Sequence, residues 1–528
     1  MPRNAILAIC SCALLAGCAA SQSSSVLEPS ADDSPSSASM SGGEVLSPRR
    51  YFVDEAIPEI RIDTEGGLAI DDPSLVIPDE HKGLMGEIPV YDYVGAKISV
   101  SNCEGYELQE VEGSVKVRGN YTSTYEKKPI RIKFSKKQAM CGLNEGRKFK
   151  SWVLLSEYKD PSMLRNALAD YLGGSLLSQH GGYCADFRFA KVYLNGSYNG
   201  LYLLTEQQQT GEGRVSIDEP IDPEKSEDGE TSVKTGYFFE YDGYYEQEKE
   251  LERFSIDYSE IRKHNGDTYR PNGRPGGWGW GNQANGFTIK SDIYTPEQNA
   301  FVKKCVQSIW DVVADATQVD HSDLSAHPYH TMDENGDYIA DPTIEGTREA
   351  IEKVIDLNSL VDIYLLNEIA QDMDIGWSSF YFALDMSESG THKLIYTAPW
   401  DFDSAYGNMS NSAQNNSLYA MDSNNQWLFA FGREKWFYEL ASNRYREIED
   451  AGIFDGAKKL IDDYVDSYRD AFAENFARWP NSIGRRIDTQ VDAVASFRTE
   501  EDAASYLRDW LSERLRNLRY LLEDEELA

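Results

Sequence analysis

The chain alternates hydrophobic and polar residues in its first half and spaces hydrophobic residues at a helical period in its second half. Alternation is typical of a half-buried β-strand, whereas apolar residues three and four positions apart are typical of a helix. Strands are predicted over residues 59–62, 88–94, 96–100, 114–118, 129–134, 152–155 and 237–240. Helices are predicted over residues 161–177, 296–316, 346–371, 433–447, 450–478, 487–497 and 500–524. This order predicts an α+β fold with a β-rich N-terminal lobe and an α-rich C-terminal lobe.

Two hairpins are predicted from the turns between apolar runs. Asn195-Gly196 joins the runs 189–194 and 200–204, and Asn-Gly in this position is a strong hairpin signal. A second hairpin is predicted from strands over 378–384 and 393–397. The start of one antiparallel strand lies beside the end of its partner. Residues before and after this second hairpin are therefore expected at the same end of it.

Three carboxylates flank the second hairpin. Asp374 precedes its first strand, whereas Asp401 and Asp403 follow its second strand and are expected on the same side of an extended backbone. Gathered carboxylates repel each other unless a proton or a divalent cation lies among them, and Mg²⁺ prefers oxygen ligands. A solvated acidic rim is the alternative on so acidic a chain. Aromatic residues around the acids favour a site, namely Trp377, Phe380, Tyr381, Phe382, Trp400 and Phe402.

The N-terminus has the pattern of an export signal. Arg3 precedes an apolar run over 5–15, and the ending Leu-Ala-Gly-Cys18 resembles a bacterial lipobox, in which the cysteine is lipidated. We therefore expect a signal peptide over 1–17 and an extracytoplasmic protein anchored to the cell membrane through lipid on Cys18. An ordinary secretory signal is the alternative. Residues 18–48 are rich in Ser, Ala, Asp and Pro, which predicts a disordered tether.

Composition narrows the classes of protein and partner. The 528 residues include 88 acidic and 51 basic ones, for a net charge of −37, which makes nucleic acid an unexpected partner. With 41% hydrophobic residues the chain can bury a core. After the N-terminus, no apolar run is long enough for a polytopic membrane protein. A Gly- and Trp-rich stretch near 265–286 is interpreted as a long loop or lid.

Four cysteines remain beyond the predicted lipidation site: Cys103, Cys141, Cys184 and Cys305. An exported protein meets an oxidising environment, so one or two disulfides are expected among three alternative pairings. The sequence alone does not choose between these pairings. Metal-ligand spacing of cysteine or histidine is absent from the sequence, which argues against a structural zinc site.

Several short motifs in a fixed order resemble the CotH kinase family, atypical protein kinases related to spore-coat protein H. The motifs are Lys-Val-Arg-Gly-Asn at 116–120, Lys-Lys-Pro-Ile-Arg-Ile-Lys-Phe at 127–134, Trp-Val-Leu-Leu at 152–155, Met-Leu-Arg-Asn-Ala-Leu at 163–168, the hairpin at 192–206, Leu-Leu-Asn-Glu-Ile at 365–369, Ser-Phe-Tyr at 379–381 and Pro-Trp-Asp-Phe-Asp at 399–403.

The resemblance implies a two-lobed, protein-kinase-like fold with an N-terminal β extension over 49–110, an N-lobe over 111–206 and a C-lobe over 207–528. It implies transfer of the γ-phosphate of ATP, with Mg²⁺ or Mn²⁺, to a hydroxyl of a protein substrate at the cell surface. By position, Asp374 resembles the catalytic base, and Asp401 and Asp403 resemble metal-binding acids. Ser379 stands where ordinary kinases place a metal-binding asparagine.

Four further residues are carried over from the resemblance. Lys133 resembles the phosphate-contacting lysine and Lys128 is its rival, while a solvated strand face is the alternative for both. Glu206 ends a hairpin as a kinase hinge strand does, so backbone groups near it are expected to hold adenine. Arg165 is expected to pair with an acid or a phosphate, and a salt bridge on a helix surface is the alternative.

The sequence also departs from ordinary kinases, which leaves other functions open. It contains neither a Gly-x-Gly-x-x-Gly loop nor a His-Arg-Asp motif. A catalytically degenerate surface lipoprotein that binds or scaffolds is therefore the main alternative to a kinase. A hydrolase that uses Asp374 and Asp401 as paired acids is a third hypothesis, and it requires carboxyl groups about 5–9.5 Å apart.

Overall fold

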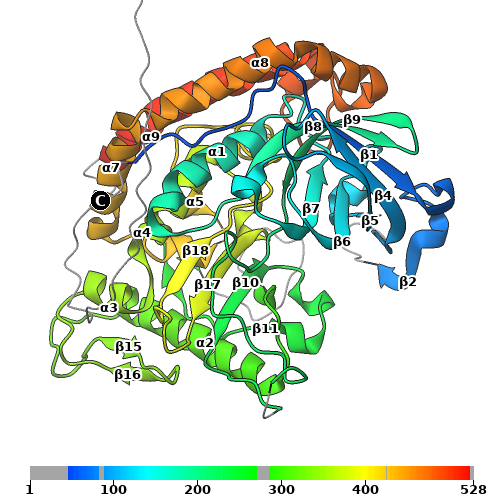
Figure 1. Cartoon of the computed structure of the whole chain (residues 1–528). Helices are drawn as coiled ribbons and strands as arrows, with labels where there is room; N and C mark the ends of the chain where they lie inside the picture. The colour runs from blue at the N-terminus through cyan, green and yellow to red at the C-terminus, as the bar shows by residue number, and fades with distance from the viewer. Residues whose placement is uncertain (1–45, 82–87, 227–228, 270–284, 424, 524–528) are drawn as a thin grey trace, which may run out of the picture. The chain divides into compact units, whose positions relative to one another are not determined.

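The computed structural model describes residues 46–81, 88–226, 229–269, 285–423 and 425–523 (Figure 1). The predicted signal peptide and nearly all of the predicted tether lie outside these ranges, as does most of the Gly- and Trp-rich stretch. Within the ranges the fold is mixed α+β, with strands concentrated toward the N-terminus and helices toward the C-terminus, as predicted. Among the described residues, no helix combines the length and the hydropathy needed to cross a bilayer.

A closed β-barrel forms the N-terminal part. Its strands, in spatial order, are β1 (Glu59–Thr64), β4 (Val94–Ser101), β5 (Leu108–Val117), β6 (Ile130–Gln138), β7 (Phe149–Leu155), β9 (Ser197–Glu206) and β8 (Phe187–Leu194). Alternation explains the barrel wall, because Ile130, Ile132 and Phe134 of β6 are buried inside it. Arg131 and Lys133 therefore project from the outer face of the barrel.

The predicted strands are found with shifted ends, and one is divided. The run 88–94 contributes β3 (Pro89–Tyr91), which pairs with β2 (Val76–His81), and then the first residue of β4. The barrel also joins regions that the resemblance separates. Strands β1 and β4 fall in the predicted extension over 49–110, yet they close one barrel with the strands of 111–206.

A second sheet lies next in the chain. Its strands, in spatial order, are β11 (Arg253–Phe254), β14 (Gly286–Ile289), β10 (Gly236–Asp242), β17 (Phe380–Asp385) and β18 (Leu394–Thr397). The antiparallel pairing of β17 with β18 and of β8 with β9 confirms both predicted hairpins. Two small hairpins accompany the sheets: β12 (Ile261–Arg262) with β13 (Thr268–Tyr269), and β15 (His330–Met332) with β16 (Tyr338–Ala340).

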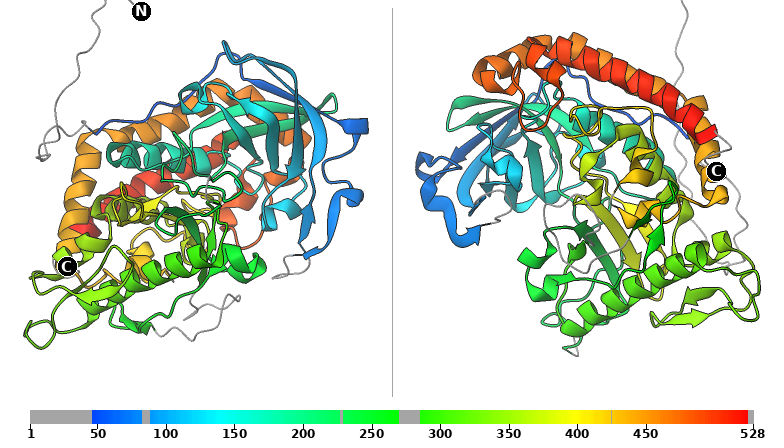
Figure 2. Two further views of the ribbon diagram at one scale, coloured as in Figure 1. Left: turned by 60° about the horizontal axis from the view of Figure 1, so that its bottom comes forward. Right: turned by 180° about the vertical axis from the view of Figure 1, so that it is seen from behind.

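Helices pack against the second sheet and each other. They are α1 (Arg165–Leu177), α2 (Pro296–Gln318), α3 (Thr347–Val354), α4 (Leu357–Ala370), α5 (Tyr419–Asp422), α6 (Gln426–Phe429), α7 (Lys435–Asp450), α8 (Ile453–Arg478) and α9 (Glu500–Glu523). Helix α4 packs on β18 and on α1, and α8 contacts both α1 and β9. Figure 2 shows α9 lying along α8. This scaffold holds the β17–β18 hairpin rigidly beside the barrel.

The helix predicted over 346–371 is divided into α3 and α4. Ile355 is extended and bridges to Leu394 of β18, which interrupts the helical backbone. The Asp356 side chain then accepts a hydrogen bond from the Ser359 amide and starts α4 as its N-cap. Tertiary pairing with the sheet therefore overrides a continuous apolar period.

The prediction of a helix over residues 487–497 is wrong. The structure has only a short 3-10 turn over Asp492–Ser496, preceded by an irregular segment. In that segment the Thr489 carbonyl accepts from the Ser410 amide at 2.8 Å, and the Val491 amide donates to the Asn408 carbonyl at 3.0 Å. Asp488 has a left-handed φ of 56°, which is incompatible with a helix there. The chain between α8 and α9 therefore returns to the segment that follows Asp403.

Candidate active site

A cavity of about 640 Å³ lies between the outer face of the barrel and the open end of the β17–β18 hairpin. Its walls come from segments far apart in sequence, including 116–122, 155–159, 373–379, 400–404 and 488–489. Pockets of about 300–1,000 Å³ suit small molecules of the size of a nucleotide. The cavity is therefore large enough for such a ligand.

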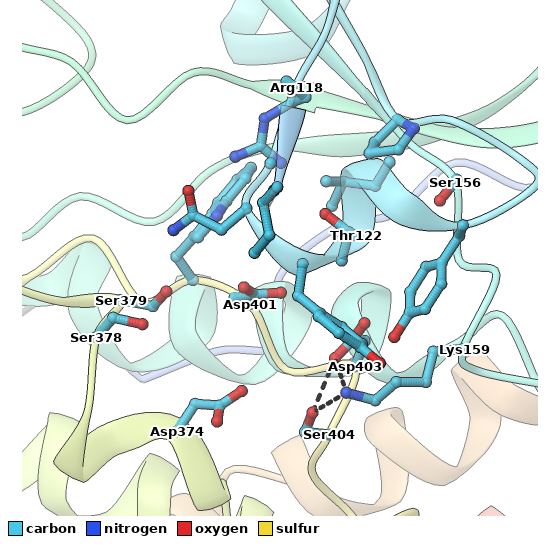
Figure 3. Close-up of a pocket in the computed structure, with 18 of the residues that line it drawn as sticks. Arg118, Thr122, Ser156, Lys159, Asp374, Ser378, Ser379, Asp401, Asp403 and Ser404 are labelled. Atoms are coloured by element: carbon cyan, nitrogen blue, oxygen red, sulfur yellow. Dashed lines mark hydrogen bonds and ion pairs between the residues drawn. The ribbon is translucent and has the colours of Figure 1, made fainter. Parts of the chain in front are cut away.

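The three predicted carboxylates line this cavity (Figure 3). Asp374 lies in the 3-10 turn Met373–Gly376, whose start is capped by the Asp372 side chain. Asp401 and Asp403 follow β18, and the Phe402 amide between them donates to Asn166 Oδ1 at 2.7 Å. The hairpin thus brings the acids to one wall, as its antiparallel topology predicts. Their chemical roles stay predictions.

The pKa values of two of these acids are displaced upward. Desolvation, followed by the charges of Asp403 and Asp374, raises the pKa of Asp401 to about 7. Desolvation also raises the pKa of Asp374, although Lys159 opposes this effect. Each shift means that the surroundings disfavour the negative charge. Additional positive charge at this wall would therefore be bound favourably.

Lys159 supplies part of that charge. Its buried ammonium group lies 3.4 Å from Asp403 Oδ1 and donates to Ser404 Oγ at 2.5 Å. Ser404 Oγ in turn donates to Asp403 Oδ1 at 3.0 Å (Figure 3). The carboxylates raise the pKa of Lys159 despite its burial, with Asp403 the largest contributor. Lys159 is therefore a cation held at the acidic wall.

The acids do not form a ready-made metal cage. Within the part of the chain that the structure describes, no group of three or more Asp, Glu, His or Cys side chains is arranged to hold a metal ion. Mg²⁺ is commonly bound by one or two carboxylates, with substrate phosphates and water completing its shell. Asp401 and Asp403 fit that partial donor set, because both present carboxylate oxygens to the same cavity wall. A cation bound here would need ligands from outside the protein.

Opposite the acids, the outer face of the barrel carries basic residues. Lys116 and Arg131 are cross-strand partners on β5 and β6, and both line the cavity. Arg118 follows β5, and its guanidinium lies 5.3 Å from the centre of the Trp400 ring. Burial lowers the pKa of Arg118, while Asp401 opposes that shift. The cavity thus has one basic wall and one acidic wall.

Ser379 also lines the cavity, at the start of β17. Its amide donates to Glu240 Oε1 at 2.7 Å, and its φ of 61° is left-handed. Glu240 is fixed from the other side by Lys290 at 2.8 Å. These contacts fix the Ser379 backbone at the cavity wall. Figure 3 shows its side chain beside that of Ser378.

Neither predicted phosphate lysine lines the cavity. Lys133 is exposed on the outer barrel face, with its ammonium 5.7 Å from the centre of the Tyr93 ring. Lys128 donates to the Ser123 carbonyl at 2.9 Å, and desolvation lowers its pKa. Arg131 shares the face of Lys133 and does line the cavity. On this strand face Arg131 therefore reaches the cavity and Lys133 does not, while the phosphate role of Lys133 stays a prediction.

Glu206 is buried in a closed network rather than in the cavity. Its carboxylate accepts from Arg214 Nε at 3.0 Å, from Asn144 Nδ2 at 2.7 Å and from the Asp186 amide. The next residues, Gln207 and Gln208, line the cavity instead.

Arg165 is likewise internal, at the start of α1. It pairs with Asp160 and donates from Nε to the Ala405 carbonyl at 3.0 Å. The expected pairing with an acid is thus found, but in the core and away from the cavity. Arg165 positions the backbone that follows Asp403 and does not face a ligand.

The cavity residues that sequence reasoning missed include Lys159, Arg118 and Asp488. Arg118 lies inside the Lys-Val-Arg-Gly-Asn motif at 116–120, so a signal for it was present. Lys159 stands just beyond the predicted strand 152–155 and had no pattern of its own. Asp488 was assigned to a helix, and only the return of the chain between α8 and α9 brings it to the cavity.

Comparisons with known proteins agree with this arrangement of motifs. A search of curated proteins returns no match. A family model described as CotH kinase protein matches residues 115–518, which is most of the chain and includes all the cavity segments named above. The chain therefore belongs to the CotH kinase family.

Proposed function

We propose that this protein transfers the γ-phosphate of ATP to a hydroxyl of a protein substrate, with Mg²⁺ or Mn²⁺ as cofactor. The observation that carries the proposal is the pairing of an acidic wall, Asp374, Asp401 and Asp403, with a basic wall in one cavity of nucleotide size. Phosphoryl transfer requires mainly positioning and neutralisation of charge. A basic wall favours a phosphorylated ligand over the neutral sugar that a glycosidase would bind.

The acids have separable roles in this proposal. Asp374 orients the acceptor hydroxyl and receives its proton, and Lys159 opposes the upward shift of the Asp374 pKa that desolvation causes. Asp401 and Asp403 would hold the metal ion together with phosphate oxygens. A bound divalent ion would neutralise charge on the transferred phosphoryl group.

A loop after β5 would take the place of the missing glycine-rich loop. Arg118, Gly119 and Asn120 all line the cavity. Gly119 has a φ of 91°, and a Cβ there would lie 2.1 Å from Thr122 Oγ1, so only glycine permits this turn. The turn directs Arg118 toward the acidic wall, where the triphosphate would lie between the two charges.

The base of the nucleotide would lie near the residues after β9. Gln208 is buried at the cavity wall, and its Oε1 has no hydrogen-bond partner among the described residues. Its Nε2 faces the Pro399 carbonyl at 3.5 Å. An unpaired buried acceptor is costly, and an amino group of a purine would satisfy it. Gln208 lies two residues beyond Glu206, so this position agrees with the adenine-binding segment expected near Glu206.

We also propose a two-lobed fold and a location at the cell membrane. A barrel followed by a helical region, with the cavity between them, supports a two-lobed, kinase-like arrangement. The lipobox-like sequence ending at Cys18 supports lipid anchoring at the extracytoplasmic face of the cell membrane, with a surface protein as substrate. Palmitate labelling of wild type and Cys18→Ala tests the anchor, and equal labelling would contradict it.

Transfer of label from γ-labelled ATP to a serine-rich acceptor protein tests the activity. Wild type and Lys133→Ala, an exposed control on the same strand as Arg131, are expected to transfer label with Mg²⁺ or Mn²⁺. Asp401→Asn is expected to lose transfer. Equal labelling by wild type and Asp401→Asn would overturn the kinase proposal. Binding of ATP without any transfer would favour a degenerate kinase that acts as a binding or scaffold protein.

A further inference from the structure

Two turns at one end of the barrel pack against each other. One follows β4 and contains Cys103, and the other follows β6 and contains Cys141. The ring of Tyr106 bridges them, because a Cβ at Gly142 would lie 3.1 Å from Tyr106 Cε2. The Tyr106 amide also donates to the Cys103 carbonyl at 2.7 Å, which fixes the ring relative to that cysteine.

Both cysteines are buried, and they belong to the same hydrophobic cluster inside the barrel. Arg188 of β8 contacts both residues through one nitrogen. Its Nη1 lies 3.6 Å from Cys103 Sγ and donates to the Cys141 carbonyl. Asp54 holds the guanidinium in place at 2.5 Å. Arg188 of β8 therefore holds the two turns in register with each other.

The other two cysteines lie in different parts of the fold. Cys184 Sγ faces the Asp170 carbonyl at 3.5 Å, beside α1. Cys305 is buried within α2 and packs near Gly336. Only one of the three pairings that the sequence leaves open joins Cys103 to Cys141, and the geometry favours that bond while keeping Cys184 and Cys305 apart.

We propose that Cys103 and Cys141 form a disulfide bond when the chain folds in an oxidising compartment, and that Cys184 and Cys305 stay as thiols. The bond would tie the turn after β4 to the turn after β6 and close a loop across the barrel end. Cross-links of this kind stabilise mainly by restricting the unfolded chain.

The chemistry requires an external disulfide as oxidant. The Cys103 thiolate attacks one sulfur of that disulfide and releases the other as a thiol, giving a mixed disulfide. Cys141 then loses its proton and attacks Cys103 Sγ, which releases the second thiol of the oxidant. Because both sulfurs are buried, the reaction belongs to folding, before the turns close.

Peptide mapping tests the pairing. The full chain is produced through a bacterial secretion route, which supplies the oxidant, and is purified without reductant. Free thiols are blocked with N-ethylmaleimide in denaturant before digestion without reduction. The expected result is a cross-linked peptide pair that contains Cys103 and Cys141, while Cys184 and Cys305 carry the blocking group. Blocked Cys103 and Cys141, or a cross-link to another cysteine, would overturn the proposal.

Variants separate the bond from general damage to the fold. Cys184→Ser is the matched control, since it removes a buried thiol and is expected to keep the cross-linked peptide. Cys103→Ser is expected to lose it. Dithiothreitol is expected to lower the melting temperature of wild type and of Cys184→Ser but not of Cys103→Ser. An equal response of all three proteins to dithiothreitol would also contradict the proposal.

Discussion

Two sets of charges in this protein, one in the helical core and one at the cavity wall, are built in different ways. In the helical core, Arg514 of α9 pairs with Glu368 of α4 at 2.9 Å, and both side chains are fully buried. Arg514 also donates to backbone carbonyls, such as that of Ser417 at 2.7 Å. Glu368 accepts from the Tyr419 amide at 2.7 Å. Charge and hydrogen bonds are therefore matched within the pair.

At the cavity wall, negative and positive charges are not matched in this way. Asp374, Asp401 and Asp403 face Lys159 and, at longer range, Arg118, and the pKa of Asp401 rises to about 7. A buried excess of one charge costs stability unless a ligand compensates it. Unbalanced charge, rather than charge itself, therefore distinguishes the candidate active site from the core of this protein.

The largest expected effect is on activity at the unbalanced wall. Asp374→Asn is expected to reduce phosphoryl transfer by about 10²–10⁴-fold, the range for loss of a general base. Its melting temperature should stay the same or rise, since the variant removes part of the repulsion between the acids. Initial rates of label transfer and thermal unfolding measure the two quantities. A variant that keeps its activity but melts at a lower temperature would contradict this role, because Asp374 would then serve stability rather than activity.

The matched core pair predicts the opposite pattern. Arg514→Met leaves the Glu368 carboxylate buried without its partner, so the free energy of unfolding is expected to fall by about 3–5 kcal/mol. Denaturant titration measures this change. The double variant Arg514→Met/Glu368→Gln should recover part of the loss, because no unpaired charge remains. A single variant that is as stable as wild type would show that the pair is not matched as described.

Glu500 is a buried acid outside the cavity, and its Oε1 has no partner among the described residues. Burial, with a contribution from Asp160, raises its pKa from 4.5 to about 8. The folded state thus binds this proton more tightly than the unfolded state, so stability is lost as pH rises through this interval. Glu500→Gln should flatten the pH dependence of unfolding between pH ~5 and ~8. An unchanged slope would contradict the burial argument.

A smaller effect is expected for the cation at the acidic wall. Lys159→Met removes a positive charge beside Asp403, so a divalent ion should bind more tightly, by roughly tenfold for charges at this separation. Transfer should nevertheless fall, because Asp374 loses the charge that opposes its upward pKa shift. Metal titrations of ATP binding and of transfer distinguish the two effects. Weaker metal binding in this variant would mean that Lys159 helps to build the metal site.

The sequence predicted the features that depend on local pattern. Strand periodicity and the Asn195-Gly196 turn determine the hairpin of β8 and β9, and antiparallel topology alone placed Asp374 near Asp401. On β6 the period of two placed Arg131 and Lys133 on the same face. Which of them lies over the cavity depends on how the barrel closes, and this information is not local.

Features that depend on the tertiary partners of a charge could not be predicted from the sequence. The sequence gives no indication that the side chains of Arg165 and Glu206 pair with Asp160 and Arg214 in the core. The segment around Asp488 has a helical pattern, yet its backbone pairs with residues 408–410 instead. The role of Lys159 could not be predicted from the sequence around it, because that role depends on its ion pair with Asp403. Asp403 lies 244 positions further along the chain.

Calorimetric titration of ATP into the protein, with and without Mg²⁺, tests the central claim most directly. The account predicts that wild type binds ATP more tightly with Mg²⁺ than without it, because the ion offsets the excess charge of the acidic wall. In Asp401→Asn this metal dependence should largely disappear, while binding of ATP to the basic wall remains. Equal affinity with and without Mg²⁺ in wild type would contradict the account.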